Sequence, residues 1–441
     1  MSQSIDQAVR VPVEVKHEPC PKCQAMLPVY EGYKTWCDQC GWNLEAQLDL
    51  RPQPLFQRLY ATLSRRTGED LFAEMKANPP DKARLVPARL LAYVIAGCVH
   101  AITLAFIGLG LWLCIFAFPT IGLLGVIIGL PFLTLVWFLL IPHPRQTKAP
   151  ILEREKYPGL HALVERIAQA LGSSPVDSIR YDMNYNAAFG RFGWRRRSAL
   201  ILGLPLVASL DGQELVALIS HELAHGVSGD PNKGLFLGSA VSALGNWYGL
   251  IDPSRRWTMR FGFVAPLMFI INLVCLPISW LLWLLGYLLV FLTWHDLQRA
   301  EYRADWLGAQ VAGSTAQLSL LDKAQLYETF TIVLRFSYID RKTGTFFPNL
   351  KRRTRKVPAR ELERLRRIEA LSTTRVDYSH PSVSKRMDFL KAHPVREPQV
   401  SLSEAEEAGI ERELLPLENG VQNWMMSLDR LTFQETFKVK V

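Results

Sequence analysis

The segment 214–230 holds the residues best suited to chemistry, with His221, Glu222 and His225 in the order His-Glu-x-x-His. On a helix, the two histidines lie one turn apart and face the same way, so two neutral imidazoles can bind one Zn²⁺. Glu222 points about 100° round the helix, beside the metal, where it can act as general base on a zinc-activated water. The five-residue pattern alone does not exclude ordinary core or surface histidines.

A catalytic zinc needs a third protein ligand and an open fourth position. Glu301 and Asp305 lie four residues apart on one face of the helix expected at 298–313. Glu301 is therefore the candidate third ligand, and Asp305 is placed to orient a ligand histidine. A solvated acid pair beside Arg299 and Arg303 is the alternative interpretation.

A second candidate metal site lies near the N-terminus, where two Cys-x-x-Cys pairs follow each other. They consist of Cys20, Cys23, Cys37 and Cys40. Four thiolates in this pattern predict a zinc ribbon, with Gly41 available for a tight turn. Metal would supply most of the folding energy of so small a unit, and thiolates that stay reduced favour the cytoplasm. A pair of redox dithiols is the alternative.

The elements that must position the histidines can be read from the flanking pattern. An amphipathic helix is expected at 158–172, followed by strand-like segments at "SIRYDM", "YNAAFG" and "SALILG". Asp211 with Glu214 three residues later forms a capping-box pattern, so the histidine helix has a defined start.

Two apolar runs, 90–142 and 261–294, contain no Asp, Glu, Lys or Arg. Each is longer than the roughly 20 residues that cross a bilayer, which predicts an integral membrane protein. The cations flanking the first run place both of its ends in the cytoplasm; they are Lys82, Arg84, Arg89, Arg145 and Lys148. This topology accounts for the net charge of +9 without a nucleic-acid partner.

The order of these motifs resembles a known family. "HELAH", a hydrophobic insertion and then "EYRAD" are similar to the integral-membrane zinc metalloproteases that include the HtpX heat-shock protease and the CAAX prenyl protease, the gluzincin family M48. "NAAFG" and "SHPSVSKRMDFL" look like two further segments of that family. The resemblance covers about residues 155 to 392 and the preceding membrane hairpin.

The resemblance implies a role for each matched residue. His221, His225 and Glu301 would bind catalytic zinc, with Glu222 as general base and then acid, and Asp305 behind the ligands. Asn186 would lie near the bound substrate strand, and His380 and Arg386 near the oxyanion. Two zinc ions are expected in all, one catalytic and one structural in the ribbon.

The predicted fold is an α-helical membrane protein with a mainly helical α+β, gluzincin-type catalytic domain and a small N-terminal zinc ribbon. The expected divisions are a ribbon at 1–45, a linker at 46–88, a transmembrane hairpin at 89–142, a metalloprotease domain at 143–394 with inserted membrane segments at 234–251 and 261–294, and a helical tail at 395–441.

Two arrangements of the inserted segments bring His225 and Glu301 to one metal. In the first, 234–251 crosses the bilayer and part of 261–294 crosses back, so that the last helix carries Glu301 to the zinc. In the second, 261–294 folds into a hairpin at Pro277. The length of the segments favours the first, although it places the three arginines of 255–260 outside, against the positive-inside rule.

These features predict a zinc endopeptidase that cleaves membrane or membrane-proximal proteins, for quality control or processing. Its expected partners are protein or peptide substrates and the lipid bilayer. Its expected location is an inner membrane of bacterial type, multi-pass, with the ribbon and the catalytic site on the cytoplasmic side. A CAAX-type prenyl protease and a non-catalytic scaffold that recruits partners through the ribbon are the alternatives. The basic run 351–367 suits either anionic headgroups or a solvated helix face.

Overall fold

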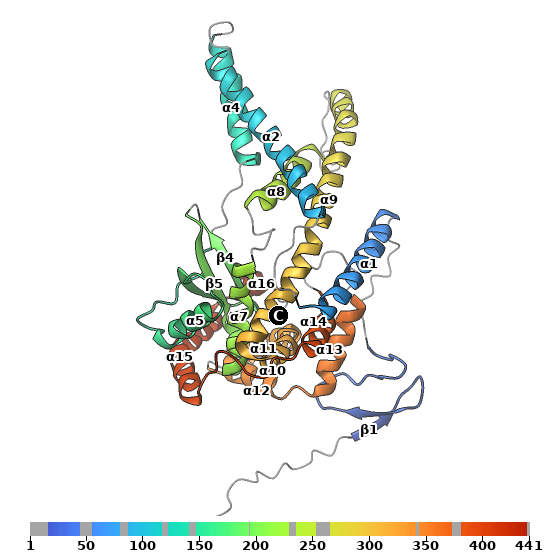
Figure 1. Cartoon of the computed structure of the whole chain (residues 1–441), viewed down its shortest axis with the longest axis vertical. Coiled ribbons are helices and arrows are strands. Elements are labelled where there is room, and N and C mark those ends of the chain that lie inside the picture. Colours follow the sequence, from blue (N-terminus) through green and yellow to red (C-terminus); the bar gives the residue numbers. More distant parts are fainter. Residues whose placement is uncertain are drawn as a thin grey trace, which may run out of the picture.

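The computed structural model describes residues 16–44, 55–79, 87–116, 122–140, 147–193, 195–228, 235–252, 265–340, 344–372 and 381–438. Helices dominate these ranges, and the strands form two small sheets. Figure 1 shows α2, α4 and one end of α9 projecting from a compact part that holds the sheet and the remaining long helices. The strand β1 lies at the opposite end of the molecule.

The chain begins with a two-stranded hairpin, continues through α1 and the apolar helices α2 and α4 to the three-stranded sheet, and ends in further helices, among them the long α9. The first half comprises β1 (Lys16–Pro19), β2 (Met26–Val29), α1 (Leu55–Ala77), α2 (Pro87–Ile115), α4 (Leu123–Leu140), α5 (Pro158–Ala170), β3 (Ser178–Asp182), β4 (Ala187–Phe192), β5 (Arg197–Gly203) and α6 (Leu204–Val207). The second half comprises α7 (Gly212–Ser228), α8 (Leu235–Ile251), α9 (Ala265–Ala312), α10 (Ser314–Ala324), α11 (Tyr327–Asp340), α12 (Phe346–Arg355), α13 (Ala359–Ser372), α14 (Val383–Ala392), α15 (Glu404–Ser427) and α16 (Arg430–Phe437).

The larger sheet has the order β3-β5-β4, with β3 parallel and β4 antiparallel to the central strand. β4 is therefore an edge strand, and it contacts the histidine helix α7. The expected helix at 158–172 is α5, and its apolar stripe packs into the same core as the sheet and α7. The three strand-like segments predicted from the sequence are confirmed as β3, β4 and β5.

Gly203 at the end of β5 has a packing role that only glycine can fill. A Cβ atom there would lie 1.9 Å from the carbonyl oxygen of Asn184 and 2.3 Å from that of Asn186. Both are backbone atoms, so the β3–β4 connection can cross the end of β5 only because residue 203 has no side chain. The crossing is closed by the Gly203 amide, which donates to the Asn186 carbonyl at 2.9 Å.

Among the described residues, two helices are long and apolar enough to cross a membrane, over Ala88–Ile115 and Phe269–Ala312. α4 is shorter, at 18 residues with Pro131 inside it. Many exposed large apolar side chains lie on these three helices; examples are Leu104, Ile115, Leu123, Phe269 and Trp280. Apolar side chains facing outward all round a helix are what a lipid environment favours.

α9 is one continuous helix of 48 residues that passes through Pro277 without turning back. The alternative in which 261–294 folds into a hairpin at Pro277 is therefore wrong. A proline inside a helix loses one backbone hydrogen bond and is tolerated in membrane helices. At about 1.5 Å per residue the helix is roughly 70 Å long, enough to cross a bilayer and still reach the catalytic core.

The basic run 351–367 lies at the end of the molecule away from the projecting apolar helices, where Figure 1 shows α12 and α13. Most of its cations have acidic partners: Lys351 with Glu418, Arg355 with Glu411, Arg360 with Asp38, Arg364 with Glu361, Arg366 with Asp322 and Arg367 with Glu363. These internal pairs favour a folding role over contact with lipid headgroups.

Candidate metal centre

The helices α7 and α9 pack side by side and bring His221, His225 and Glu301 together. The Nε2 atoms of the two histidines lie 3.2 Å apart, with their rings at 89° to each other. The Glu301 carboxylate lies 3.6 Å from His221 Nε2 and 3.4 Å from His225 Nε2. All three residues are buried. The two imidazoles and the carboxylate thus converge on one point from two helices that are distant in the sequence.

This donor set fits a zinc ion. Two ligand atoms held tetrahedrally at about 2 Å from zinc lie roughly 3.3 Å apart, close to the three separations seen here. Two imidazole nitrogens and a carboxylate oxygen are also the ligand types of catalytic zinc, which keeps its fourth position open. Glu222 is not one of the three converging residues.

Asp305, one turn after Glu301 on α9, lies behind the histidines. Its Oδ1 lies 3.2 Å from His221 Nδ1, within the distance of an ion pair, but the two groups are not aligned for a hydrogen bond. Burial disfavours the charged imidazole, but the Asp305 carboxylate outweighs it and raises the pKa of His221 above its usual 6.5. Zinc would have to displace that proton, because only the neutral imidazole binds metal.

The side chain of Arg386 on α14 holds Asp305 in place. Its Nε donates to Asp305 Oδ2 and its Nη2 to Oδ1, both at 2.7 Å. Asp305 also accepts a hydrogen bond from Gln317 Nε2 at 3.1 Å. Arg386 Nη2 lies 3.6 Å from Glu301 as well. These contacts favour a role for Arg386 in fixing the carboxylates behind the metal, rather than the role beside the oxyanion that the resemblance implies.

Glu222 faces the edge strand β4. Its Oε2 accepts a hydrogen bond from the backbone amide of Phe189 at 3.0 Å. The Phe189 ring lies against Gly226, where a Cβ atom would come within 2.6 Å of the ring. The strand and the general-base candidate are therefore in direct contact, and the glycine after His225 permits the close approach.

Asn186 lies at the start of the same strand and lines a cavity of about 970 Å³. The cavity is formed by the β3–β4 connection, α11 and the helices α15 and α16. The contact to Glu222 is made by Phe189 and not by Asn186. His380 falls in 373–380, outside the described residues.

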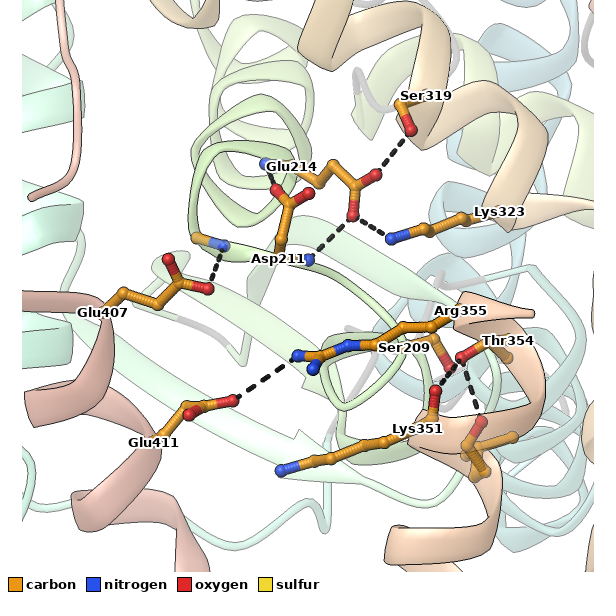
Figure 2. A network of polar contacts seen from close by, with 12 residues as sticks. Ser209, Asp211, Glu214, Ser319, Lys323, Lys351, Thr354, Arg355, Glu407 and Glu411 are labelled. Atoms are coloured by element: carbon orange, nitrogen blue, oxygen red, sulfur yellow. Dashed lines mark hydrogen bonds and ion pairs between the residues drawn. The ribbon is translucent and has the colours of Figure 1, made fainter. Parts of the chain in front are cut away.

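A network of polar contacts holds the start of α7, as Figure 2 shows. The capping box predicted from the sequence is confirmed: Asp211 Oδ1 accepts from the Glu214 amide at 2.9 Å, and Glu214 accepts from the Asp211 amide at 2.7 Å. Buried Glu214 also contacts Ser319 and Lys323 of α10. Glu407 of α15 accepts from the Gly212 amide at 2.8 Å. Three carboxylates thus lie at the positive end of the zinc-site helix.

The four N-terminal cysteines also converge. Their sulfur atoms all lie within 4.8 Å of one another, which fits four thiolates around one zinc ion. The strands β1 and β2 form the antiparallel hairpin that carries the first pair. Gly41 has a φ of +68° and donates to the Cys37 carbonyl at 3.1 Å, as expected for the tight turn of the second pair.

Several residues of the site were not predicted from the sequence. Gln317, Lys323 and Glu407 contact it from elements that follow α9 in the chain. Glu369 on α13 accepts a hydrogen bond from the Val383 amide at the start of α14. An isolated glutamate or glutamine on an amphipathic helix carries no signal of its target, so only the tertiary packing identifies these contacts.

Comparison with known proteins supplies the identity of the catalytic part. The family model for peptidase family M48 matches residues 154–393, more than half of the chain. The chain belongs to peptidase family M48. This family consists of zinc metallopeptidases, and the matched range contains every residue of the His-His-Glu centre.

Individual relatives of the M48 chain are HtpX proteins of modest identity. A protease HtpX homolog of Pyrobaculum calidifontis is 25% identical over 342 residues, covering 72% of this chain and 92% of the relative. Protease HtpX homolog 1 of Saccharolobus solfataricus is 29% identical over 184 residues, covering 39% of this chain and 56% of the relative. Protease HtpX of Psychrobacter sp. is 26% identical over 184 residues, covering 40% and 59%. No solved structure matches.

Proposed function

We propose that this M48 chain is a zinc-dependent endopeptidase that acts on membrane or membrane-proximal proteins. The observation that carries the proposal is the convergence of His221, His225 and Glu301 within 4.8 Å, with Glu222 beside them against an edge strand. Zinc bound there would activate a water molecule and polarise the scissile carbonyl. A second zinc ion would be structural, held by the four cysteines.

Glu222 is the residue that moves the proton in this proposal. Its carboxylate takes a proton from the attacking water and later delivers it to the leaving amine. The Phe189 amide, which donates to Glu222 Oε2 at 3.0 Å, fixes the carboxylate next to the strand. Asp305 and Arg386 act one step further away, by holding His221 and Glu301 in the metal-binding geometry.

The peptide is proposed to bind along β4. β5 occupies one side of β4, and no other described strand pairs with its second side. An extended peptide can therefore add to the sheet at this edge by backbone hydrogen bonds, which hold many sequences in the same way. A peptide lying there passes directly beside Glu222 and the three ligands, because Phe189 is in the middle of the strand.

The position of the centre on α9 supports a membrane-proximal substrate. Glu301 follows the apolar part of the same continuous helix, so the metal lies close to the surface where α9 would leave the bilayer. By the positive-inside rule this surface is cytoplasmic. Substrates are then membrane proteins, or chains that meet the membrane at that surface.

The test compares Glu222→Gln with the unmodified protein in detergent, on casein and on a membrane-protein substrate. We expect cleavage to fall by at least about 100-fold, the lower range for loss of a general base, with the zinc content unchanged. Glu155→Gln, at an exposed glutamate outside α7 and α9, is the matched control and should cleave normally. Retained cleavage by Glu222→Gln would remove this residue from the proposed role.

A further inference from the structure

The cysteine ribbon is docked on the catalytic domain through one tryptophan. Trp36 is 1% exposed, and its ring lies between two arginines of α13, with its centroid 4.7 Å from the Arg360 guanidinium carbon and 5.0 Å from that of Arg367. Arg360 donates to the Trp36 carbonyl at 2.8 Å and Arg367 to the Asp38 carbonyl at 3.0 Å. Arg360 also lies 3.3 Å from the Asp38 carboxylate.

These contacts form a clamp made by one face of α13. Residues 360 and 367 are two turns apart and therefore point the same way. Cation–π contacts with partly desolvated arginines contribute more than exposed ion pairs do. The same two arginines contact the loop between Cys37 and Cys40, so the clamp includes the backbone that would hold the ribbon's metal.

The last turns of α13 hold the start of α14. Glu369 is largely buried, and its Oε2 accepts a hydrogen bond from the Val383 amide at 2.9 Å. The first amides of a helix have no partner within the helix, and a carboxyl oxygen placed there satisfies one of them. Ser382 caps the same end by accepting from the Lys385 amide. Glu369 thus connects the start of α14 to α13, the helix that contacts the ribbon.

α14 in turn holds the metal centre. Arg386 lies one turn after Val383, and its two 2.7 Å bonds fix Asp305, which lies 3.2 Å from the ligand His221. Contacts therefore run without interruption from Trp36 through α13 and α14 to a zinc-ligand candidate. Because Arg386 is part of α14, a shift of α14 changes the position of the guanidinium that holds Asp305.

We propose that Glu369 is a positioning residue for the catalytic zinc, and that the docked ribbon stabilises the helix from which it acts. The proposal rests on the zinc endopeptidase function and gives the ribbon a role within the chain. It predicts that loosening either the Glu369 contact or the arginine clamp weakens zinc binding at His221, His225 and Glu301. A ribbon that only recruits other proteins would leave that affinity unchanged.

The first experiment compares Glu369→Gln with Glu361→Gln. Glu361 lies on the same helix but accepts its hydrogen bonds from Arg364 of α13 itself, so it controls for general damage to α13. Catalytic zinc affinity is measured by competition with a chelator, and amide hydrogen exchange is followed over 383–392. We expect Glu369→Gln to lose at least about tenfold in zinc affinity, the lower end for residues behind metal ligands, and to exchange faster at the start of α14.

The second experiment keeps Glu369 and removes the clamp with the double change Arg360→Gln and Arg367→Gln. Both arginines lie at the ribbon interface, so replacing them leaves the fold of the core preserved. The clamp variant therefore still tests the proposal if Glu369→Gln proves unable to fold. We expect faster exchange over 383–392 and weaker zinc binding at the catalytic centre, by roughly threefold or more. When the clamp variant is combined with Glu369→Gln, the loss of zinc affinity should be smaller than the product of the two separate losses, because both changes act through α14.

The outcomes separate this proposal from the function on which it rests. If the unmodified protein binds no zinc at the histidines or cleaves nothing, the proposed function fails. If it binds zinc and cleaves, but Glu369→Gln and the clamp variant match Glu361→Gln in zinc affinity and in exchange over 383–392, the positioning role is overturned and the enzyme stands.

Discussion

Replacement of Arg386 by methionine tests the buried support behind the metal ligands. The Asp305 side chain is completely buried and would lose both 2.7 Å bonds to the guanidinium, while keeping its contacts with Gln317 and His221. Removing one partner of a buried ion pair costs about 3–5 kcal/mol, because it leaves an uncompensated charge in the interior. Arg386→Met should therefore remove a large part of the net stability, which for a domain is typically about 5–15 kcal/mol.

The assay is guanidinium unfolding in detergent micelles, followed by far-ultraviolet circular dichroism without added zinc. Arg355→Met is the matched control, since its ion pair with Glu411 is exposed and 3.9 Å long, and it should cost less than about 1 kcal/mol. The double change Arg386→Met with Asp305→Leu should recover much of the loss, because an apolar pair leaves no buried charge. A single variant that costs no more than the control, or a double variant that recovers nothing, would refute the reasoning.

Three further predictions concern other contacts of the site. Gly226→Ala places a Cβ atom 2.6 Å from the Phe189 ring, so we expect about 1–3 kcal/mol of overpacking and reduced cleavage with unchanged zinc content, measured by unfolding and peptidase assay. Lys323→Met leaves Glu214 buried with one cation fewer and should cost roughly 1.5–3 kcal/mol in the same unfolding assay. Burial raises the pKa of Glu369 from 4.5 to about 7. The folded state therefore holds the proton more tightly than the unfolded chain, and at about 1.36 kcal/mol per pH unit roughly 3 kcal/mol of stability is lost as pH rises from about 4.5 to about 7, a loss that Glu369→Gln should abolish in a series of unfolding curves.

The local parts of the fold were predictable because their signals are short and physical. The capping box at Asp211, the strands beside it and the amphipathic helix at 158–172 depend on near neighbours in the sequence, and the structure contains all of them. Membership of family M48 was likewise predicted from two motifs separated by a hydrophobic insertion. The requirement for a third ligand made Glu301 a candidate, and the resemblance to the family implied its pairing with the histidines.

The parts that could not be predicted depend on long-range packing. The sequence left open whether the chain turns back at Pro277, since proline both breaks soluble helices and occurs inside membrane helices. The contact of Arg386 with Asp305 was not predicted, because the segment that holds Arg386 carries no signal of its partner on α9. The ion pairs of the basic run 351–367 depend on the positions of α10 and α15, and the clamp on Trp36 depends on the position of the ribbon, none of which a local pattern encodes.

The central claim is that His221, His225 and Glu301 bind one zinc ion, independently of the four cysteines. It is tested most directly by counting zinc per chain in purified unmodified protein and in Glu301→Ala, by elemental mass spectrometry after dialysis. We predict two zinc ions for the unmodified chain and one for Glu301→Ala, with the remaining ion lost when Cys20 and Cys37 are also replaced by serine. A Glu301→Ala protein that still holds two zinc ions would contradict the metal centre described above.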